Sequence, residues 1–171
     1  MPEPTALPDI AYIDAEHAML TSFLDYYRVV FLRKIEDLTD DQSRRRLPPS
    51  DLDLLGMTRH LADVERWWFR SVFTAEVSDG NYASEDDPDL DWHHGPADTI
   101  AEARDVWHTE VARAREIIIG SQDLGAIGAY TSGSRGEISL RWIMIHMIEE
   151  YARHGGHADF LRENIDGATG D

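Results

Sequence analysis

Apolar residues recur at helical spacing in four long segments of this 171-residue chain, and none of its segments has a convincing strand pattern. These segments run from Asp14 to about residue 38, from about residue 54 to Phe73, from about Ala97 to Ile119, and from Ser139 to about residue 164. Asp14 and Ser139 are of the residue types that cap helix N-termini. The pattern predicts an all-α fold, and four long helices favour a four-helix bundle.

The segments between these helices predict connectors. A short helix before Pro48 and Pro49 has to end near Leu47, because proline removes a backbone donor and restricts the residue before it. Residues 78–98 are rich in Asp, Gly and Pro and predict a long loop between helices two and three, while TSGSRGE at 131–137 predicts a turn. The length suits one domain over residues 1–171, with flexible tails at about 1–12 and 166–171.

Composition narrows the classes of function. The chain has 33 acidic and 16 basic residues and a net charge of −17, which opposes binding to nucleic acid or to anionic membranes. It has no apolar run of the roughly 18 to 20 residues that span a bilayer, and MPEPTALPDIAYID lacks the features of a signal peptide, so we expect a cytoplasmic protein. The absence of cysteine excludes disulfides and a cysteine nucleophile. Any thiol chemistry therefore uses a thiol that a substrate brings.

The last helical segment, HMIEEYARHGGHADFLRE, concentrates the groups that can carry chemistry. At about 100° per residue, a sector of about 80° on that helix contains His146, Glu150, His154 and His157. Glu150 and His154 fall inside the apolar stripe, where a carboxylate is costly unless it is paired, hydrogen-bonded or metal-bound. A Glu and a His four residues apart can chelate one ion from a single helix.

The second helical segment supplies a candidate third ligand. His60 in TRHLADVERWWFR shares its face with apolar residues, namely Met57, Leu61, Val64, Trp67 and Trp68. Two nitrogens and one carboxylate oxygen would leave coordination positions open, which is typical of a catalytic site rather than a structural one. We therefore predict a divalent metal, zinc with nickel as the alternative, on His60, Glu150 and His154.

Simpler readings of these residues stay open at this point. His60 alone could be a hydrogen-bonded core histidine, and Glu150 with His154 could be an ion pair within one helix. His146 and His157 are expected beside the metal or the substrate, with His157 an alternative ligand. Exposed positions are expected for the acidic loop SEDDPDLDW, which lacks the pattern of an EF-hand, and for Glu65, Arg66, His93, His94 and Glu149.

The segments LLGMTRHLADVERWWFR, SLRWIMIHMIEEYARHGGHADFLRE and IDGATG carry a family resemblance. The chain resembles the DinB/YfiT-like superfamily, in the domain-of-unknown-function branch that includes mini-circle proteins and is similar to mycothiol-dependent S-transferases. The resemblance implies an up-down-down-up four-helix bundle with metal ligands at His60, Glu150 and His154. Many relatives have histidine at the position of Glu150, and glutamate there is similar to the mycothiol-dependent maleylpyruvate isomerase type. Relatives are often homodimers.

The expected function is metal-dependent transfer of a low-molecular-weight thiol, mycothiol, to a small electrophilic substrate. Metal coordination would lower the pKa of the thiol, and the thiolate is the nucleophile. His157 or His146 could accept the thiol proton, and Arg153 could bind an acidic group of the cosubstrate. Two alternatives are a metal-dependent hydrolase of small molecules and a non-catalytic metal-binding stress or interaction protein.

Overall fold

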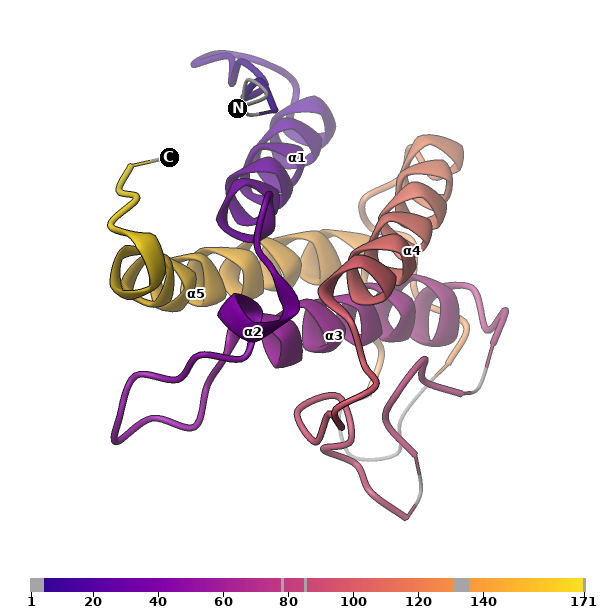
Figure 1. Ribbon diagram of the computed structural model, residues 1–171. Coiled ribbons are helices and arrows are strands. Elements are labelled where there is room, and N and C mark those ends of the chain that lie inside the picture. The colour runs from indigo at the N-terminus through magenta and orange to yellow at the C-terminus, as the bar shows by residue number, and fades with distance from the viewer. Residues whose placement is uncertain (1–4, 78, 85, 131–135, 171) are drawn as a thin grey trace.

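The described part of the chain is helical (Figure 1). A computed structural model describes residues 5–77, 79–84, 86–130 and 136–170. Its elements are α1 (Glu16–Ile35), α2 (Asp40–Ser43), α3 (Leu54–Glu65), the π-helix η1 (Arg66–Phe73), α4 (Ile100–Gly120) and α5 (Leu140–Asp166). Within these ranges the β-type pairing is a single isolated bridge between Ile127 and Ser139. The all-α prediction is confirmed, and the up-down-down-up order of a bundle stays a prediction.

Side-chain caps begin most of these helices. Ser139 accepts a hydrogen bond from the Trp142 backbone N–H at the start of α5, as the sequence predicts. The predicted cap at Asp14 is wrong, because α1 begins one residue later, with Ala15 at its N-cap and no side-chain cap. The Asp14 carboxylate accepts from the adjacent Ala15 N–H instead. Further side-chain caps are formed by Thr39 on α2, Asp53 on α3 and Thr99 on α4.

The second predicted helix is continuous to Phe73, but its second half is a π-helix. The Thr74 backbone N–H bonds to the Phe69 carbonyl, five residues back, so the last turns are wider than an α-helix. This widened segment carries the two adjacent tryptophans that the sequence places on the same face as His60. Trp68 is buried, whereas the Trp67 residue is 42% exposed.

The helices pack in pairs around one apolar core. α1 packs on α5 and α3 on α4, while contacts between α3 and α5 join the two pairs. Figure 1 shows α3 and α5 crossing the view, with α1 and α4 rising from them. Fully buried side chains from these helices include Leu24, Phe31, Leu54, Met57, Leu61, Ile143 and Met147. Each contributes about 1.5 to 3 kcal/mol by leaving water. No helix in the described ranges is long and apolar enough to cross a membrane.

The connectors agree with the sequence in outline. The short helix α2 ends at Ser43, before Pro48 and Pro49, and its Thr39 and Gln42 form a reciprocal capping box. The described residues between Thr74 and Thr99 contain no helix, so the long loop between the second and third long helices is confirmed. Of the predicted turn at 131–137, positions 131–135 lie outside the described residues.

Candidate metal centre and its pocket

His60 from α3 meets Glu150 and His154 from α5 at the contact between these helices. One ligand atom from each side chain lies within 4.8 Å of the other two. Glu150 Oε2 is 3.4 Å from His154 Nε2 and 4.0 Å from His60 Nε2. These separations exceed ordinary hydrogen bonds and suit groups that converge on an ion about 2 Å from each. The three residues that the sequence groups together thus converge, and their role as ligands stays a prediction.

The centre is partly shielded from water and carries charge in the absence of metal. The side chains of His154, Glu150 and His60 are 9%, 15% and 23% exposed. The neighbouring His154 and His60 hold the pKa of Glu150 well below its usual range, so the carboxylate is ionised. Burial disfavours protonation of His60, but its bond to Asp91 and its contact with Glu150 outweigh burial and raise the pKa of His60 to about 9.

Asp91 is a functional candidate that the sequence analysis missed. Its Oδ2 is 2.7 Å from His60 Nδ1, so Nδ1 is the donor to this carboxylate and Nε2 faces Glu150. A carboxylate on the far nitrogen is the usual means of orienting a metal-binding histidine. Trp92 covers the same histidine, with ring centroids 4.9 Å apart. The prediction of a solvated acidic loop is wrong here, since Asp91 is only 5% exposed.

Polar side chains at the start of α3 and along it form hydrogen bonds that hold this loop against the helix. Asp53 pairs with His94 at 2.8 Å, so the prediction that His94 is exposed is wrong, whereas His93 is exposed as predicted. Arg59 donates to the Leu90 carbonyl at 2.7 Å and to Asp98 at 2.9 Å. One further turn along, the Asp63 carboxylate accepts from the backbone N–H groups of residues 81, 82 and 83. Arg59 and Asp63 are four residues apart and share one face of the helix, which is a signal that could have revealed this anchored loop.

The remaining predicted site residues lie around the centre. His146 Nε2 is 3.5 Å from Glu150 Oε1, and its Nδ1 is 3.1 Å from the exposed Glu149. These three residues form a second group of potential metal ligands. The ring of His157 lies 5.6 Å from that of His154, outside both groups, and its Nδ1 is buried without a hydrogen-bond partner in the described chain. Arg153 is exposed on α5.

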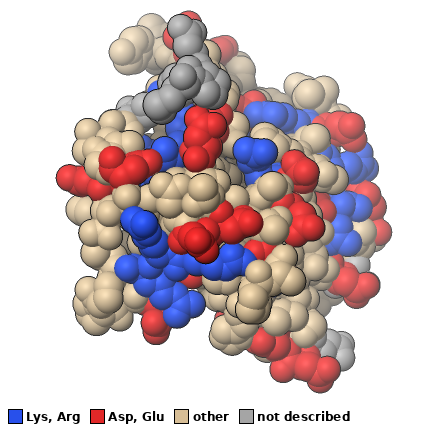
Figure 2. All heavy atoms as spheres, in the orientation of Figure 1, with Lys and Arg blue, Asp and Glu red and all other residues tan. Residues whose placement is uncertain are grey.

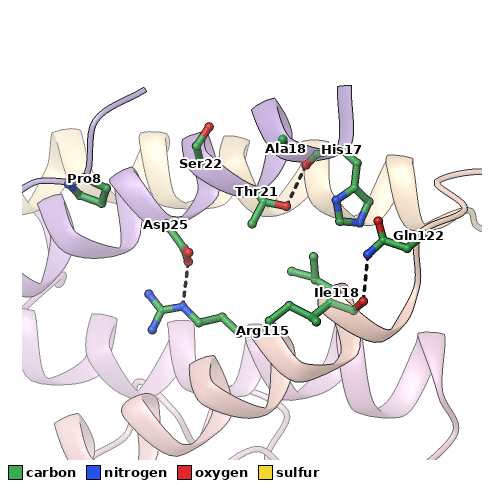
Figure 3. A pocket seen from close by; sticks show the side chains of 10 residues that line it. Pro8, His17, Ala18, Thr21, Ser22, Asp25, Arg115, Ile118 and Gln122 are labelled. Carbon is green, nitrogen blue, oxygen red and sulfur yellow. Dashed lines mark hydrogen bonds and ion pairs between the residues drawn. The ribbon is translucent and has the colours of Figure 1, made fainter. Parts of the chain in front are cut away.

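A pocket of about 840 Å³ adjoins the centre at His60. One wall comes from the second helix, with Val64, Trp67 and Trp68, and the other from the anchored loop between Asp79 and Asp91. Another hollow, of about 510 Å³, lies between α1 and α4 (Figure 3). The polar side chains that line it are already engaged in hydrogen bonds, as Asp25 with Arg115 and His17 with the Ser121 carbonyl. The pocket beside His60 therefore offers space for a substrate next to side chains that could bind a metal ion.

A second buried polar cluster corrects the prediction that Glu65 faces solvent. Glu65 is fully buried and accepts two bonds of 2.7 Å from Arg28. The Tyr151 hydroxyl donates to the same carboxylate at 2.8 Å, and the Trp107 indole donates to that hydroxyl at 2.7 Å. Burial, together with the Glu65 charge, raises the pKa of Tyr151 well above its ordinary value. The sequence pattern on the second helix does not reveal a partner on α1, so the cluster was missed.

The fold and this centre define a helical protein with a histidine–carboxylate site on facing helices and a pocket beside it. The chain matches the family model described as mycothiol-S-transferase over residues 19–167. It therefore belongs to the mycothiol-S-transferase family, which confirms the resemblance seen in the sequence. No curated protein matches the chain.

Proposed function

We propose that the protein is a metal-dependent transferase that joins the sulfur of mycothiol to an electrophilic carbon of a small substrate. The convergence of His60, Glu150 and His154 at the wall of a large pocket carries this proposal. Membership of the mycothiol-S-transferase family supports the choice of thiol. The zero cysteine count agrees with a nucleophile that arrives with the cosubstrate.

The donor set fits a divalent ion. Two imidazole nitrogens and one carboxylate oxygen suit zinc, with nickel as the alternative, and leave positions for a further ligand. His60 is preoriented because Asp91 holds its Nδ1–H, and Glu150 is ionised and ready to accept a cation. An ion held there would act as a Lewis acid that lowers the pKa of a coordinated thiol.

The other polar residues are assigned to handling protons and the cosubstrate. Burial, with smaller contributions from His154 and Arg153, lowers the pKa of His157 and so favours the neutral imidazole, the form that can accept a proton. His146, beside Glu150, is the alternative acceptor. Arg153, exposed on α5, is assigned to an acidic group of a cosubstrate. In the transfer the sulfur–carbon bond forms as the bond to the leaving group breaks, and the thiol proton passes through the histidine to solvent.

A panel of small electrophiles tests this function. The zinc-loaded protein should form thioether product with mycothiol, while the metal-free protein and the His60→Ala variant should not. His93→Ala, which removes an exposed histidine in the loop, is the matched control and should retain turnover. Hydrolysis of an electrophile by the zinc-loaded protein in the absence of mycothiol would instead favour a hydrolase. Zinc binding without turnover of any electrophile would favour the non-catalytic alternative.

A further inference from the structure

The pocket beside His60 has an aromatic and acidic character that bears on which electrophile it accepts. Its aromatic side chains are Trp67 and Trp68 from η1 and Tyr82 from the anchored loop. The lining also contains carboxylates, which belong to Asp63, Asp79 and Asp91. Among the described residues that line the pocket there is no lysine or arginine. A planar ligand between these aromatic side chains would therefore lie near carboxylates rather than near lysine or arginine side chains.

The loop that forms one wall is rich in acidic residues, most of them between residues 85 and 91. Residues 79–91 contain six acidic residues and no lysine, arginine or histidine, the acidic ones being Asp79, Glu85, Asp86, Asp87, Asp89 and Asp91. Figure 2 shows carboxylates gathered at the lower right, where Figure 1 shows the tip of this loop. At physiological ionic strength such charges act over about 8 Å, and two of them, Asp79 and Asp91, line the pocket itself.

The cationic side chains nearest the pocket are already engaged. Arg59 bonds to Asp98 and to the Leu90 carbonyl, and its guanidinium lies 4.3 Å from the centre of the Tyr82 ring. Arg66 donates to the Asp79 carbonyl and to Glu110. His60, the basic side chain of the lining, lies between Asp91 and Glu150. None of these three groups offers an unengaged cation to an anionic substrate.

We propose that this pocket selects electrophiles with an aromatic, cationic body, accepts neutral ones less well and rejects anionic ones. The Tyr82 ring already faces the Arg59 guanidinium, so the rings that can attract a further cation are those of Trp67 and Trp68. The carboxylates of the lining add Coulomb attraction. An anion would lose hydration and meet no lysine or arginine among the described residues that line the pocket. The inference rests on the proposed function for the reactive step, but the charge preference itself is a property of the pocket.

Equilibrium binding of unreactive probes isolates that preference. Three probes share one ring system and differ in charge, and none is a strong zinc ligand: 2-naphthylmethylammonium, 2-naphthylmethanol and naphthalene-2-sulfonate. Titration of the full-length protein, metal-free and zinc-loaded, is followed by the NMR signals of the Trp67 and Trp68 indole N–H groups. The ammonium probe should bind at least about tenfold more tightly than the sulfonate at low salt, with the alcohol between them. Raising the salt concentration should narrow the gap.

A charge-matched pair of variants localises the effect. Asp79→Asn removes one carboxylate from the pocket lining and should reduce the preference for the ammonium probe several-fold. Asp105→Asn removes the same charge from the exposed face of α4 and should leave the preference unchanged. Equal affinity for the three probes, tighter binding of the sulfonate, or equal effects of the two variants would overturn the proposal.

Turnover separates this inference from the proposed function. Two benzylic halides, one carrying an ammonium group and one a sulfonate, are compared with mycothiol and the zinc-loaded protein. A charge order in probe binding without turnover of either halide supports the pocket inference and removes the transferase proposal. Turnover of both halides at equal kcat/KM supports the transferase proposal and removes the pocket inference. Preferred turnover of the ammonium halide supports both.

Discussion

Two glutamates, Glu65 and Glu150, each join α3 to α5, and they differ in what their carboxylates contact. The Glu65 oxygens accept bonds of 2.7 Å and 2.7 Å from Arg28 and 2.8 Å from Tyr151, in a fully buried setting. The Glu150 oxygens lie 3.4 to 4.0 Å from three histidine nitrogens, with 15% of the side chain exposed. The first carboxylate is saturated by donors from the protein, whereas the second keeps its lone pairs available.

This difference distinguishes a structural polar cluster from a candidate site. A buried ion pair whose hydrogen bonds are all made has no capacity left for a ligand, and breaking it leaves an uncompensated charge. A group of basic nitrogens and one carboxylate at separations too long for hydrogen bonding has capacity for a shared cation. The buried His154 Nδ1, which has no partner among the described residues, adds to the unsatisfied character of the second centre.

Removing the Glu65 charge should have the largest effect on stability. Glu65→Gln removes the buried counter-charge of Arg28 and leaves only the partly exposed Asp25 paired with it at 3.0 Å, and we expect a loss of about 3 kcal/mol in the free energy of unfolding. Glu150→Gln in the metal-free protein is the matched change on the facing helix and should cost less than Glu65→Gln, because the Glu150 oxygens lie 3.4 to 4.0 Å from their histidine partners rather than 2.7 Å. Urea denaturation of both variants measures the difference. Similar losses of stability in the two variants would show that Glu150, like Glu65, has a mainly structural role.

Removing a nitrogen from the second centre should abolish tight zinc binding while the fold is retained. His60→Ala and His154→Ala each delete one of three candidate ligands, and we expect affinity to fall by more than about 100-fold. Isothermal titration with zinc and circular dichroism measure binding and fold on the same samples. His93→Ala should bind zinc like the unmodified protein.

The ligand set can be refined with the same titrations. Glu150→Gln should weaken zinc binding, and Glu150→His should restore it because imidazole is also a zinc ligand. Unchanged affinity in Glu150→Gln would exclude this carboxylate, and His157 would become the next candidate. Full zinc retention in His60→Ala would remove that histidine from the site.

Asp91→Asn tests whether the loop orients the site. The amide can still contact His60 but loses the charge that fixes its tautomer, so zinc affinity should fall about 10- to 100-fold. The matched control is Asp87→Asn, since Asp87 makes a similar contact of 2.8 Å to the exposed His93. Titration with zinc should show no change for this control. An equal loss in both variants would mean that general loop charge, rather than the bond to His60, governs affinity.

The sequence predicted what depends on periodicity and missed what depends on pairing at a distance. Helical spacing revealed the four long helices and the shared face of Glu150 and His154, and a polar residue inside an apolar stripe marked His60. The same spacing could not reveal that Glu65 bonds to Arg28, because the two residues are 37 positions apart and lie on different helices. Asp91 was missed for a related reason, since an acidic loop has the same composition whether it is solvated or anchored. The π-helical turns of η1 were likewise not indicated by the apolar spacing, which suits an α-helix through Phe73.

The change of zinc affinity with pH should be the smallest of these effects, and it depends directly on the protonation of His60. Its pKa of about 9, raised from 6.5 because the contacts with Asp91 and Glu150 outweigh burial, means that metal has to displace a proton. Zinc affinity should therefore rise about tenfold from pH 7 to pH 8, with release of about one proton, and level off above pH 9. The stability that this protonation adds to the metal-free protein is complete below pH 6.5 and is lost as pH rises through 9. Titrations in buffers of different ionisation enthalpy count the proton, and an affinity that is flat between pH 7 and 8 would contradict a protonated His60. Asp91→Asn should lower the pKa of His60 and reduce the slope, whereas Asp87→Asn should leave it unchanged.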